Sequence, residues 1–478
     1  MQYKIFVMTI EQIYTGCLAQ GAYYITSNGE AAIVDPLREV KPYLDRLNKD
    51  NVQLKYIFET HFHADFVSGH VDLASKTGAA IVYGPNANPE FKFIGAADNE
   101  EFKIGDVTIK ILHTPGHTME STTYLLKDEN GKDYCIFSGD TLFLGDVGRP
   151  DLAQKAAHMS QEELAGLLYE SLNNKIMPLA DDVIVYPAHG AGSACGKNMM
   201  KETVDTLGNQ KRMNYALNQP DKQAFIKAVT EGLQPPPGYF GLNVAMNKKG
   251  IESFDTVLNH GMRALSPDAF EMAAEQTGAL ILDTRENIIF YKGFIPQSVN
   301  IGLDGDFAPW VGALIVEVSQ PILLVTENGK EEETVTRLSR VGFDNIIGHL
   351  EGGFAAWLAS GKEADVVDRI TAKEFAAVLE IGKDKVVDIR KETEYAAEHV
   401  EEAYNRPLAN INEWIKDINP EEHFFLHCAG GYRSMIASSI LQSRGYRNFT
   451  EVEGGFKVIA ETGVPKTNFV CQSKLMKV

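Results

Sequence analysis

Histidines and aspartates gather in four short stretches in the first half of the chain, each after an apolar run. The stretches are residues 60–70 (THFHADFVSGH), 113–118 (HTPGHT), 138–141 (SGDT) and 187–190 (PAHG). Imidazole and carboxylate groups at strand ends can converge on one point, and both types bind zinc and iron. A single histidine of this kind is more often a hydrogen-bonded residue without a metal. Four such stretches together predict a metal site.

A cysteine in the second half stands at the turn between an apolar run and an amphipathic stretch. Residues 428–434 read CAGGYRS. At a strand-to-helix turn, backbone N–H groups and the helix dipole stabilise a thiolate or a bound anion. Gly430 and Gly431 let the loop curl around the sulfur, and Arg433 can hold the oxyanion of a sulfur donor. Cys428 is therefore predicted to be a reactive thiol.

The domains that must position these residues are separated by a boundary near the middle of the chain. Three prolines in LQPPPG, residues 233–238, indicate a boundary. The region before them reads as strands with polar clusters at their ends, followed by helices, which is typical of α/β proteins. We expect a metal domain over residues 1–235 and a linker over 236–259.

The second half contains a repeat. LILDTR at 280–285 matches KVVDIR at 385–390, and LEGGF at 350–354 matches VEGGF at 452–456. Matched landmarks at one spacing indicate a duplicated domain. The copies are predicted over 260–364 and 365–478, each a small α/β unit with a largely parallel sheet.

Composition excludes several classes of protein. The net charge of −20 disfavours binding to nucleic acid or to an anionic membrane, and no apolar run approaches the ~18 residues of a membrane span. Five scattered cysteines do not form a disulfide framework. With no secretory signal at the start of the chain, we expect a cytoplasmic protein, and we expect it to form a homo-oligomer.

The four stretches of the first half resemble the metallo-β-lactamase superfamily, whose signature HxHxDH is followed by distant His, Asp and His. The resemblance implies an αββα sandwich. One departure is that Phe66 replaces the final histidine of the signature. In two-metal members that histidine helps to hold the second metal, so a two-zinc hydrolase site is disfavoured. His70 compensates only if it lies one helical turn away on the same face.

The segments THFHADFVSGH, HTPGHT, GDTLFLGDVGRPDL and PAHGAGSACGKN resemble the persulfide dioxygenase branch more specifically. That resemblance implies one Fe(II) per chain, with zinc as the alternative. The implied ligands are His61, His117 and Asp140, a two-histidine, one-carboxylate set that leaves positions open for dioxygen and a substrate sulfur. The residues expected to orient these ligands and water are His63, Asp65 and His189.

Three other residues near these motifs could be functional or structural. Arg149 either binds a carboxylate of the thiol substrate or forms an internal ion pair with Asp151. His113 is expected to be structural because the family's ligand follows Pro-Gly. Cys195 is also expected to be structural, since no neighbour supplies a base.

Residues 366–478 resemble a rhodanese domain, including Asp388, Arg390 and the closing EGGF. Related phosphatases have a longer Cys-to-Arg loop, so the shorter loop here suits a sulfane sulfur, with Cys428 cycling between thiolate and persulfide. The first copy reads TENGKEE at 326–332, without cysteine. It resembles a degenerate rhodanese, and we expect it to act as a scaffold or a dimer interface.

The whole chain resembles persulfide dioxygenase–rhodanese fusions of sulfide detoxification. The implied activity is oxidation of a thiol persulfide, of glutathione or coenzyme A type, with dioxygen to sulfite. Rhodanese sulfurtransfer would then give or use thiosulfate. The main alternative is a zinc-dependent thioester hydrolase of the glyoxalase II type with an accessory rhodanese. A non-enzymatic sulfur carrier based on Cys428 is a further alternative, which the complete metal-ligand set disfavours.

Overall fold

The computed structural model describes residues 8–233, 235–380 and 383–470. Within these residues the chain divides into two compact units. The first runs to Phe254 and also takes in Ser339–Gly342, and the second begins at Asp255 and holds the remainder.

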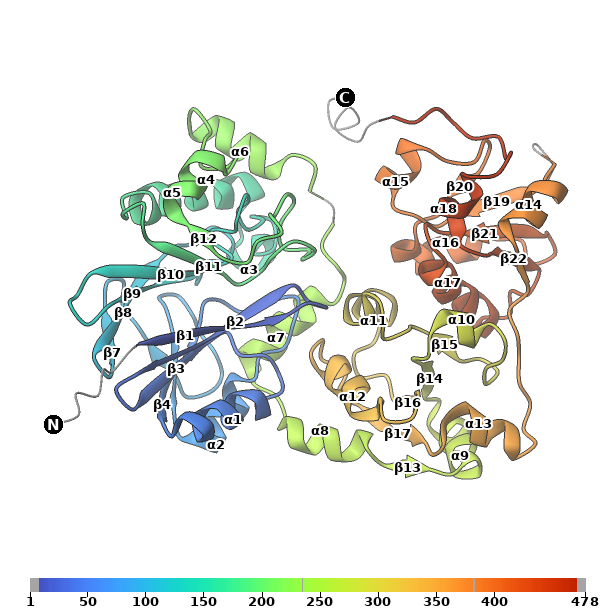
Figure 1. Cartoon of the computed structure of the whole chain (residues 1–478), viewed down its shortest axis with the longest axis horizontal. Coiled ribbons are helices and arrows are strands. Elements are labelled where there is room, and N and C mark those ends of the chain that lie inside the picture. Colours follow the sequence, from blue (N-terminus) through green and yellow to red (C-terminus); the bar gives the residue numbers. More distant parts are fainter. Residues whose placement is uncertain (1–7, 234, 381–382, 471–478) are drawn as a thin grey trace. The chain divides into compact units, whose positions relative to one another are not determined.

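The first unit contains two six-stranded sheets, in the orders β1-β2-β3-β4-β5-β6 and β12-β11-β10-β9-β8-β7 (Figure 1). The strands of the first sheet are β1 (Thr9–Thr15), β2 (Gln20–Ser27), β3 (Glu30–Val34), β4 (Gln53–Glu59), β5 (Ala80–Tyr83) and β6 (Ile94–Gly95). Those of the second are β7 (Glu101–Ile104), β8 (Val107–His113), β9 (Thr122–Lys127), β10 (Asp133–Gly139), β11 (Ile184–Pro187) and β12 (Asp205–Thr206). Strands β3 and β4 are parallel, as are β10 and β11, so in each pair the carboxyl ends meet.

Apolar residues on both faces of the central strands form three layers of hydrophobic core. One lies between the two sheets, and one lies between each sheet and the helices that cover it. Tyr23 and Ile25 of β2 pack against the second sheet, whereas Ala22 and Tyr24 belong to the cluster under the helices. Helices α1 and α2 cover one side of the sheets, and α4, α5 and α6 cover the other (Figure 1). The helices up to residue 230 are α1 (Lys41–Asp50), α2 (His70–Thr77), α3 (Gln154–Ala157), α4 (Gln161–Ser171), α5 (Leu207–Met213) and α6 (Lys222–Thr230). The αββα sandwich predicted from the sequence is confirmed.

The stretch predicted as a linker, residues 236–259, is largely helical. Helix α7 (Phe240–Lys249) belongs to the first unit. Its Val244 packs against the apolar cluster that contains Ala22 and Tyr24. Helix α8 (Phe254–Gly261) follows it. Gln234, beside the three prolines, lies outside the described residues.

The second unit contains two five-stranded parallel sheets with equivalent orders, β13-β17-β16-β14-β15 and β18-β22-β21-β19-β20. The strands of the first copy are β13 (Ala264–Leu265), β14 (Leu280–Asp283), β15 (Val299–Asn300), β16 (Ile322–Val325) and β17 (Ile346–Leu350). Those of the second copy are β18 (Arg369–Ile370), β19 (Lys385–Asp388), β20 (Tyr404–Asn405), β21 (Phe424–His427) and β22 (Phe449–Val452). The predicted duplication is therefore seen strand by strand.

Helices connect these parallel strands in both copies. They are α9 (Pro267–Thr277), α10 (Asn287–Phe290), α11 (Phe307–Leu314), α12 (Glu331–Ser339), α13 (Gly353–Ala359), α14 (Ala372–Val378), α15 (Glu392–Ala397), α16 (Ile411–Trp414), α17 (Tyr432–Ser443) and α18 (Gly455–Ile459). Among the described residues, no helix has the length and apolar character that a membrane span requires.

Candidate metal centre and sulfur-transfer loop

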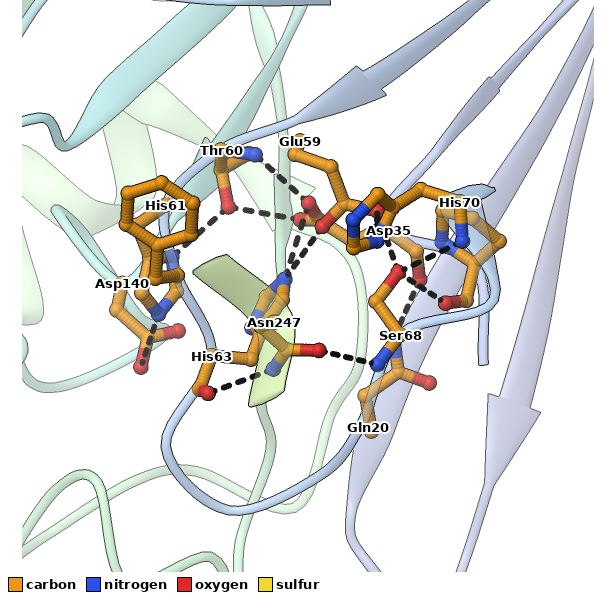
Figure 2. Close-up of polar contacts among 12 residues, drawn as sticks. Gln20, Asp35, Glu59, Thr60, His61, His63, Ser68, His70, Asp140 and Asn247 are labelled. Atoms are coloured by element: carbon orange, nitrogen blue, oxygen red, sulfur yellow. Dashed lines mark hydrogen bonds and ion pairs between the residues drawn. The ribbon is translucent and has the colours of Figure 1, made fainter. Parts of the chain in front are cut away.

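The three predicted metal ligands meet at the carboxyl ends of strands in the first unit. His61 follows β4, His117 follows β8 and Asp140 follows β10. Asp140 Oδ2 lies 3.8 Å from His61 Nε2 and 3.4 Å from His117 Nε2. All three side chains are buried, and their ligand atoms lie within 4.8 Å of one another. Figure 2 shows His61 facing Asp140.

The hydrogen bonds around the two histidines direct their lone pairs toward a common point. His117 Nδ1 donates to the carbonyl of Arg149 at 2.8 Å. Thr60 Oγ1 donates its single proton to Asp35 Oδ2 at 2.8 Å, so at 3.0 Å it accepts from His61 Nδ1. Both Nε2 atoms are therefore left as acceptors, which is the tautomer that a metal requires.

The carboxylate and the charge states also suit a cation. Asp140 Oδ2 is buried and has no hydrogen-bond partner among the described residues. Burial lowers the pKa of His61 well below its usual value and so keeps the ring neutral. Burial alone would raise the pKa of Asp140, but the neighbouring His189 and His61 hold it low. Two imidazoles and one carboxylate fit a divalent metal ion.

Asp65 and His189 extend from Asp140 as a buried chain of close polar contacts. His189 contacts Asp65 Oδ2 through Nε2 and Asp140 Oδ1 through Nδ1, both at 2.8 Å. Burial would lower the pKa of His189, but the two carboxylates raise it well above its ordinary value. The chain fixes Asp140 so that Oδ2 is the oxygen that faces the histidines.

His63 and Phe66 do not join the three-ligand cluster. His63 Nε2 lies 3.1 Å from Asp35 Oδ1 and 3.5 Å from Glu59 Oε2. Phe66 stacks on the His63 ring with centroids 4.2 Å apart. His70 also faces Glu59, with Nδ1 3.4 Å from Oε1, so it does not replace the missing signature histidine.

The remaining predicted residues of this unit lie in defined contacts. Arg149 donates to both carboxylate oxygens of Asp151 at 2.7 Å. Of the two interpretations of Arg149, the structure therefore contains the internal ion pair. His113 Nε2 donates to the carbonyl of Met119 at 3.0 Å, within the turn before β9. Cys195 is buried, and its sulfur lies within 4.8 Å of ligand atoms of Asp65 and His189.

Sequence reasoning missed Asn247, on α7. Its Nδ2 donates to the carbonyls of His63 and Phe66, and its Oδ1 accepts from Ser68 N, all at 2.8 Å (Figure 2). One buried amide therefore binds both sides of the loop that carries the HxHxD residues. Asn247 belongs to no motif, so no sequence signal identified it. For Asp35, which follows the apolar run AAIV, a strand-end signal was present.

The predicted sulfur-transfer loop connects β21 to α17 in the second copy. Gly431, with φ 101°, donates its N–H to Cys428 Sγ at 3.1 Å, and Ser434 Oγ lies 3.5 Å from the sulfur. Arg433 forms a two-bond ion pair with Glu394, at 2.7 and 2.8 Å. The glycine conformation thus brings a backbone donor to the thiol, while Arg433 is held beside the loop.

In the first copy, Thr326 follows β16 where Cys428 follows β21. The matched Asp-x-Arg segments are structural in both copies. Arg285 pairs with Asp283, and Arg390 pairs with Asp388, in each case with the aspartate buried.

Comparisons with known proteins divide the chain in the same way. Residues 15–189 match the family model described as the metallo-beta-lactamase superfamily. Residues 266–360 and 371–462 each match the rhodanese-like domain.

Curated relatives carry two different activities. The hydroxyacylglutathione hydrolase of Tolumonas auensis is 34% identical over 171 residues, which are 35% of this chain and 60% of that protein. The human protein named persulfide dioxygenase ETHE1, mitochondrial, is 26% identical over 226 residues, 47% of this chain and 81% of that protein. The chain spans 50 to 62% of the length of the first four hydrolases.

A solved structure titled metallo-beta-lactamase from Staphylococcus aureus subsp. aureus COL extends the likeness beyond the first unit. It shares 29% identity and a TM-score of 0.63, and the match covers 72% of this chain and 98% of that one.

Proposed function

We propose that this chain, which joins a metallo-beta-lactamase domain to two rhodanese-like domains, is a non-haem iron persulfide dioxygenase coupled to a sulfurtransferase. Its substrate would be a low-molecular-weight thiol persulfide of glutathione or coenzyme A type. One persulfide, one dioxygen and one water would give one thiol, one sulfite and two protons. The single observation that carries this proposal is the cluster of His61, His117 and Asp140. In the loop that holds His61, Phe66 stands in place of a second-metal ligand.

A bound Fe(II) would supply redox chemistry with dioxygen, which protein side chains and zinc do not provide. The chain's own residues hold the ligands. Asp35 acts through Thr60 on His61, the Arg149 carbonyl fixes His117, and His189 fixes Asp140. These contacts preset the direction of each ligand atom before the metal arrives. Arg149 would need to exchange its bond to Asp151 if it also binds a substrate carboxylate.

The second step would take place at Cys428. Its thiolate attacks the outer sulfur of a persulfide, the S–S bond breaks, and the free thiolate of the carrier leaves. Sulfite then attacks the outer sulfur on Cys428, releasing thiosulfate and regenerating the cysteine thiolate. The Gly431 N–H stabilises negative charge on the sulfur throughout. Joining the sites in one chain raises the local concentration of the sulfur intermediate.

A second candidate, a zinc thioester hydrolase of the glyoxalase II type, is favoured by the relatives named hydroxyacylglutathione hydrolase. That chemistry needs a metal to generate the attacking hydroxide. Phe66 offers no lone pair for a second metal, and His63 faces Asp35, which weighs against a two-metal version of this site.

The test is oxygen uptake by the full chain, loaded with Fe(II) without air, after addition of glutathione persulfide. Uptake matched by sulfite supports the dioxygenase. His117→Ala is expected to abolish uptake, whereas Cys428→Ser is expected to keep uptake and lose thiosulfate. A zinc-loaded sample that cleaves a glutathione thioester, together with an iron-loaded sample that takes up no oxygen, would establish the hydrolase instead.

A further inference from the structure

Tyr432, inside the sulfur-transfer loop, contacts the first rhodanese copy. Its hydroxyl donates to the carbonyl of Gly302 at 2.8 Å. Burial raises the pKa of Tyr432 above its ordinary value, so the phenol remains a donor at neutral pH. Tyr432 therefore bonds the sulfur-transfer loop to the other copy, directly beside Arg433 and the buried Ser434.

The ring of Tyr432 packs against two glycines of the first copy, Gly302 and Gly305. A Cβ atom at Gly305 would lie 2.4 Å from the ring Cζ, closer than atoms can approach, and one at Gly302 would lie 3.5 Å from Cε2. The ring therefore rests on the backbone of the segment that follows β15. No side chain fits at Gly305 while the ring keeps this position.

The same segment has a different sequence in the second copy. Ile301 N donates to Asp283 O in the first copy as Arg406 N donates to Asp388 O in the second. The position after each is Gly302 in one copy and Pro407 in the other. The degenerate copy thus differs from its duplicate at the point where it contacts Tyr432.

A separate route reaches the thiol from the first copy. The Arg369 guanidinium lies over the Tyr291 ring at 4.4 Å and pairs with Glu451 at 2.7 Å. Glu451 accepts from Ser434 Oγ at 2.6 Å, and Ser434 lies beside Cys428 Sγ. Tyr291 belongs to the first copy, so the loop is anchored from two directions.

We propose that the degenerate copy is the docking surface that sets the conformation of the sulfur-transfer loop, and that Tyr432 is the positioning residue through which it does so. Gly430 and Gly431 leave the loop many conformations, and the Tyr432 contact selects the one in which Gly431 N–H meets the sulfur. The inference rests on the proposed function only in assigning a reaction to Cys428.

The test uses the full chain with a change made in the first copy, far from Cys428 in sequence. Gly305→Ala places a methyl group against the Tyr432 ring. The rate of Cys428 alkylation by iodoacetamide at neutral pH, followed by mass spectrometry of its peptide, is expected to fall about tenfold or more because small misplacements at a reacting group have effects of this size. The kcat/KM for transfer from thiosulfate to cyanide is expected to fall with it. Tyr432→Phe keeps the ring on Gly305 but loses the bond to Gly302. Its alkylation rate and its kcat/KM are expected to lie between those of the wild type and those of Gly305→Ala.

Ser439→Ala is the matched control. It removes the 2.9 Å bond between Asn300 N and Ser439 Oγ, which joins the same two copies away from the loop. A loss in Gly305→Ala that exceeds the loss in Ser439→Ala at equal thermal stability supports the proposal. Wild-type alkylation and kcat/KM in Gly305→Ala would overturn it. Failure of the proposed sulfur transfer has a different signature, namely full sulfurtransferase activity in Cys428→Ser.

Discussion

At the scale of single residues, the Thr60 hydroxyl connects a buried carboxylate to a metal ligand. It donates to Asp35 and accepts from His61 Nδ1, so it decides which nitrogen of His61 carries the proton. Groups that orient metal ligands in this way contribute strongly to metal affinity although they never contact the metal.

Thr60→Val keeps the shape of this side chain and removes the hydroxyl. We expect metal affinity to fall about tenfold to a hundredfold, measured by competition with a chelator of known affinity. Thr114→Val is the control, because Thr114 is also buried and its hydroxyl bonds to the hydroxyls of Thr123 and Thr141 rather than to a histidine. Equal affinities for the two variants would contradict the orienting role of Thr60.

Phe66 is the residue that departs from the superfamily signature, and its replacement tests the single-metal site directly. Asp65, His189 and Asp140 already lie together. Phe66→His adds an imidazole beside them, and we expect metal content to rise from one toward two ions per chain, measured by elemental analysis. Phe66→Leu, which adds no ligand, is expected to stay at one. A single ion in both variants would show that more than Phe66 excludes the second metal.

At the scale of elements, the strand ends that carry the candidate ligands were predictable from the sequence, and the helix that supports the first of them was not. His61, His117 and Asp140 each follow an apolar strand, and this pattern is visible in the sequence. Asn247 lies in a stretch without a motif. Its importance arises from docking α7 against backbone carbonyls that no sequence pattern marks.

Asn247→Ala leaves the carbonyls of His63 and Phe66 and the N–H of Ser68 buried without their partner. We expect the free energy of unfolding to fall by about 3 kcal/mol or more, since each of these three unsatisfied buried groups costs about 1 to 3 kcal/mol. Metal retention during dialysis is expected to fall as well. Asn243→Ala, one turn earlier on α7 and equally buried, is the control, and it is expected to retain metal. Loss of metal from both variants would point to α7 as a whole.

Two of the predicted side chains show a different limit of sequence reasoning. Arg149 and Arg433 each had a plausible role toward an anionic substrate, and each lies in an ion pair, with Asp151 and Glu394 respectively. The partner of Arg149 is two positions away, so the sequence alone indicates this ion pair as one interpretation. The partner of Arg433 is 39 positions away, on another element, and only the fold brings it close.

At the scale of the whole molecule, the two candidate sites lie in different compact units and consist of different residue types. The sequence indicated this division through its motifs and its repeat. It did not indicate that one repeat contacts the candidate sulfur-transfer loop of the other, because the contact of Tyr432 with Gly302 joins positions with no shared pattern.

Removal of the metal is expected to separate the two proposed activities. After treatment with a chelator, the full chain is expected to lose oxygen uptake and to keep transfer of sulfur from thiosulfate to cyanide, because none of the metal ligands lies in the unit that holds Cys428. Restoration of uptake by Fe(II) but not by Zn²⁺ would support the iron assignment. Loss of both activities on chelation would contradict separate sites.

The bond between Asn247 and the metal loop has a practical consequence for anyone who isolates the first unit. The three prolines at 235–237 look like the natural place to cut the gene. A fragment that stops there loses α7, and the HxHxD loop loses the amide that closes it. A recombinant fragment extended to Phe254 keeps that amide, and a protease that nicks the chain just after the prolines should be tolerated only while α7 stays bound.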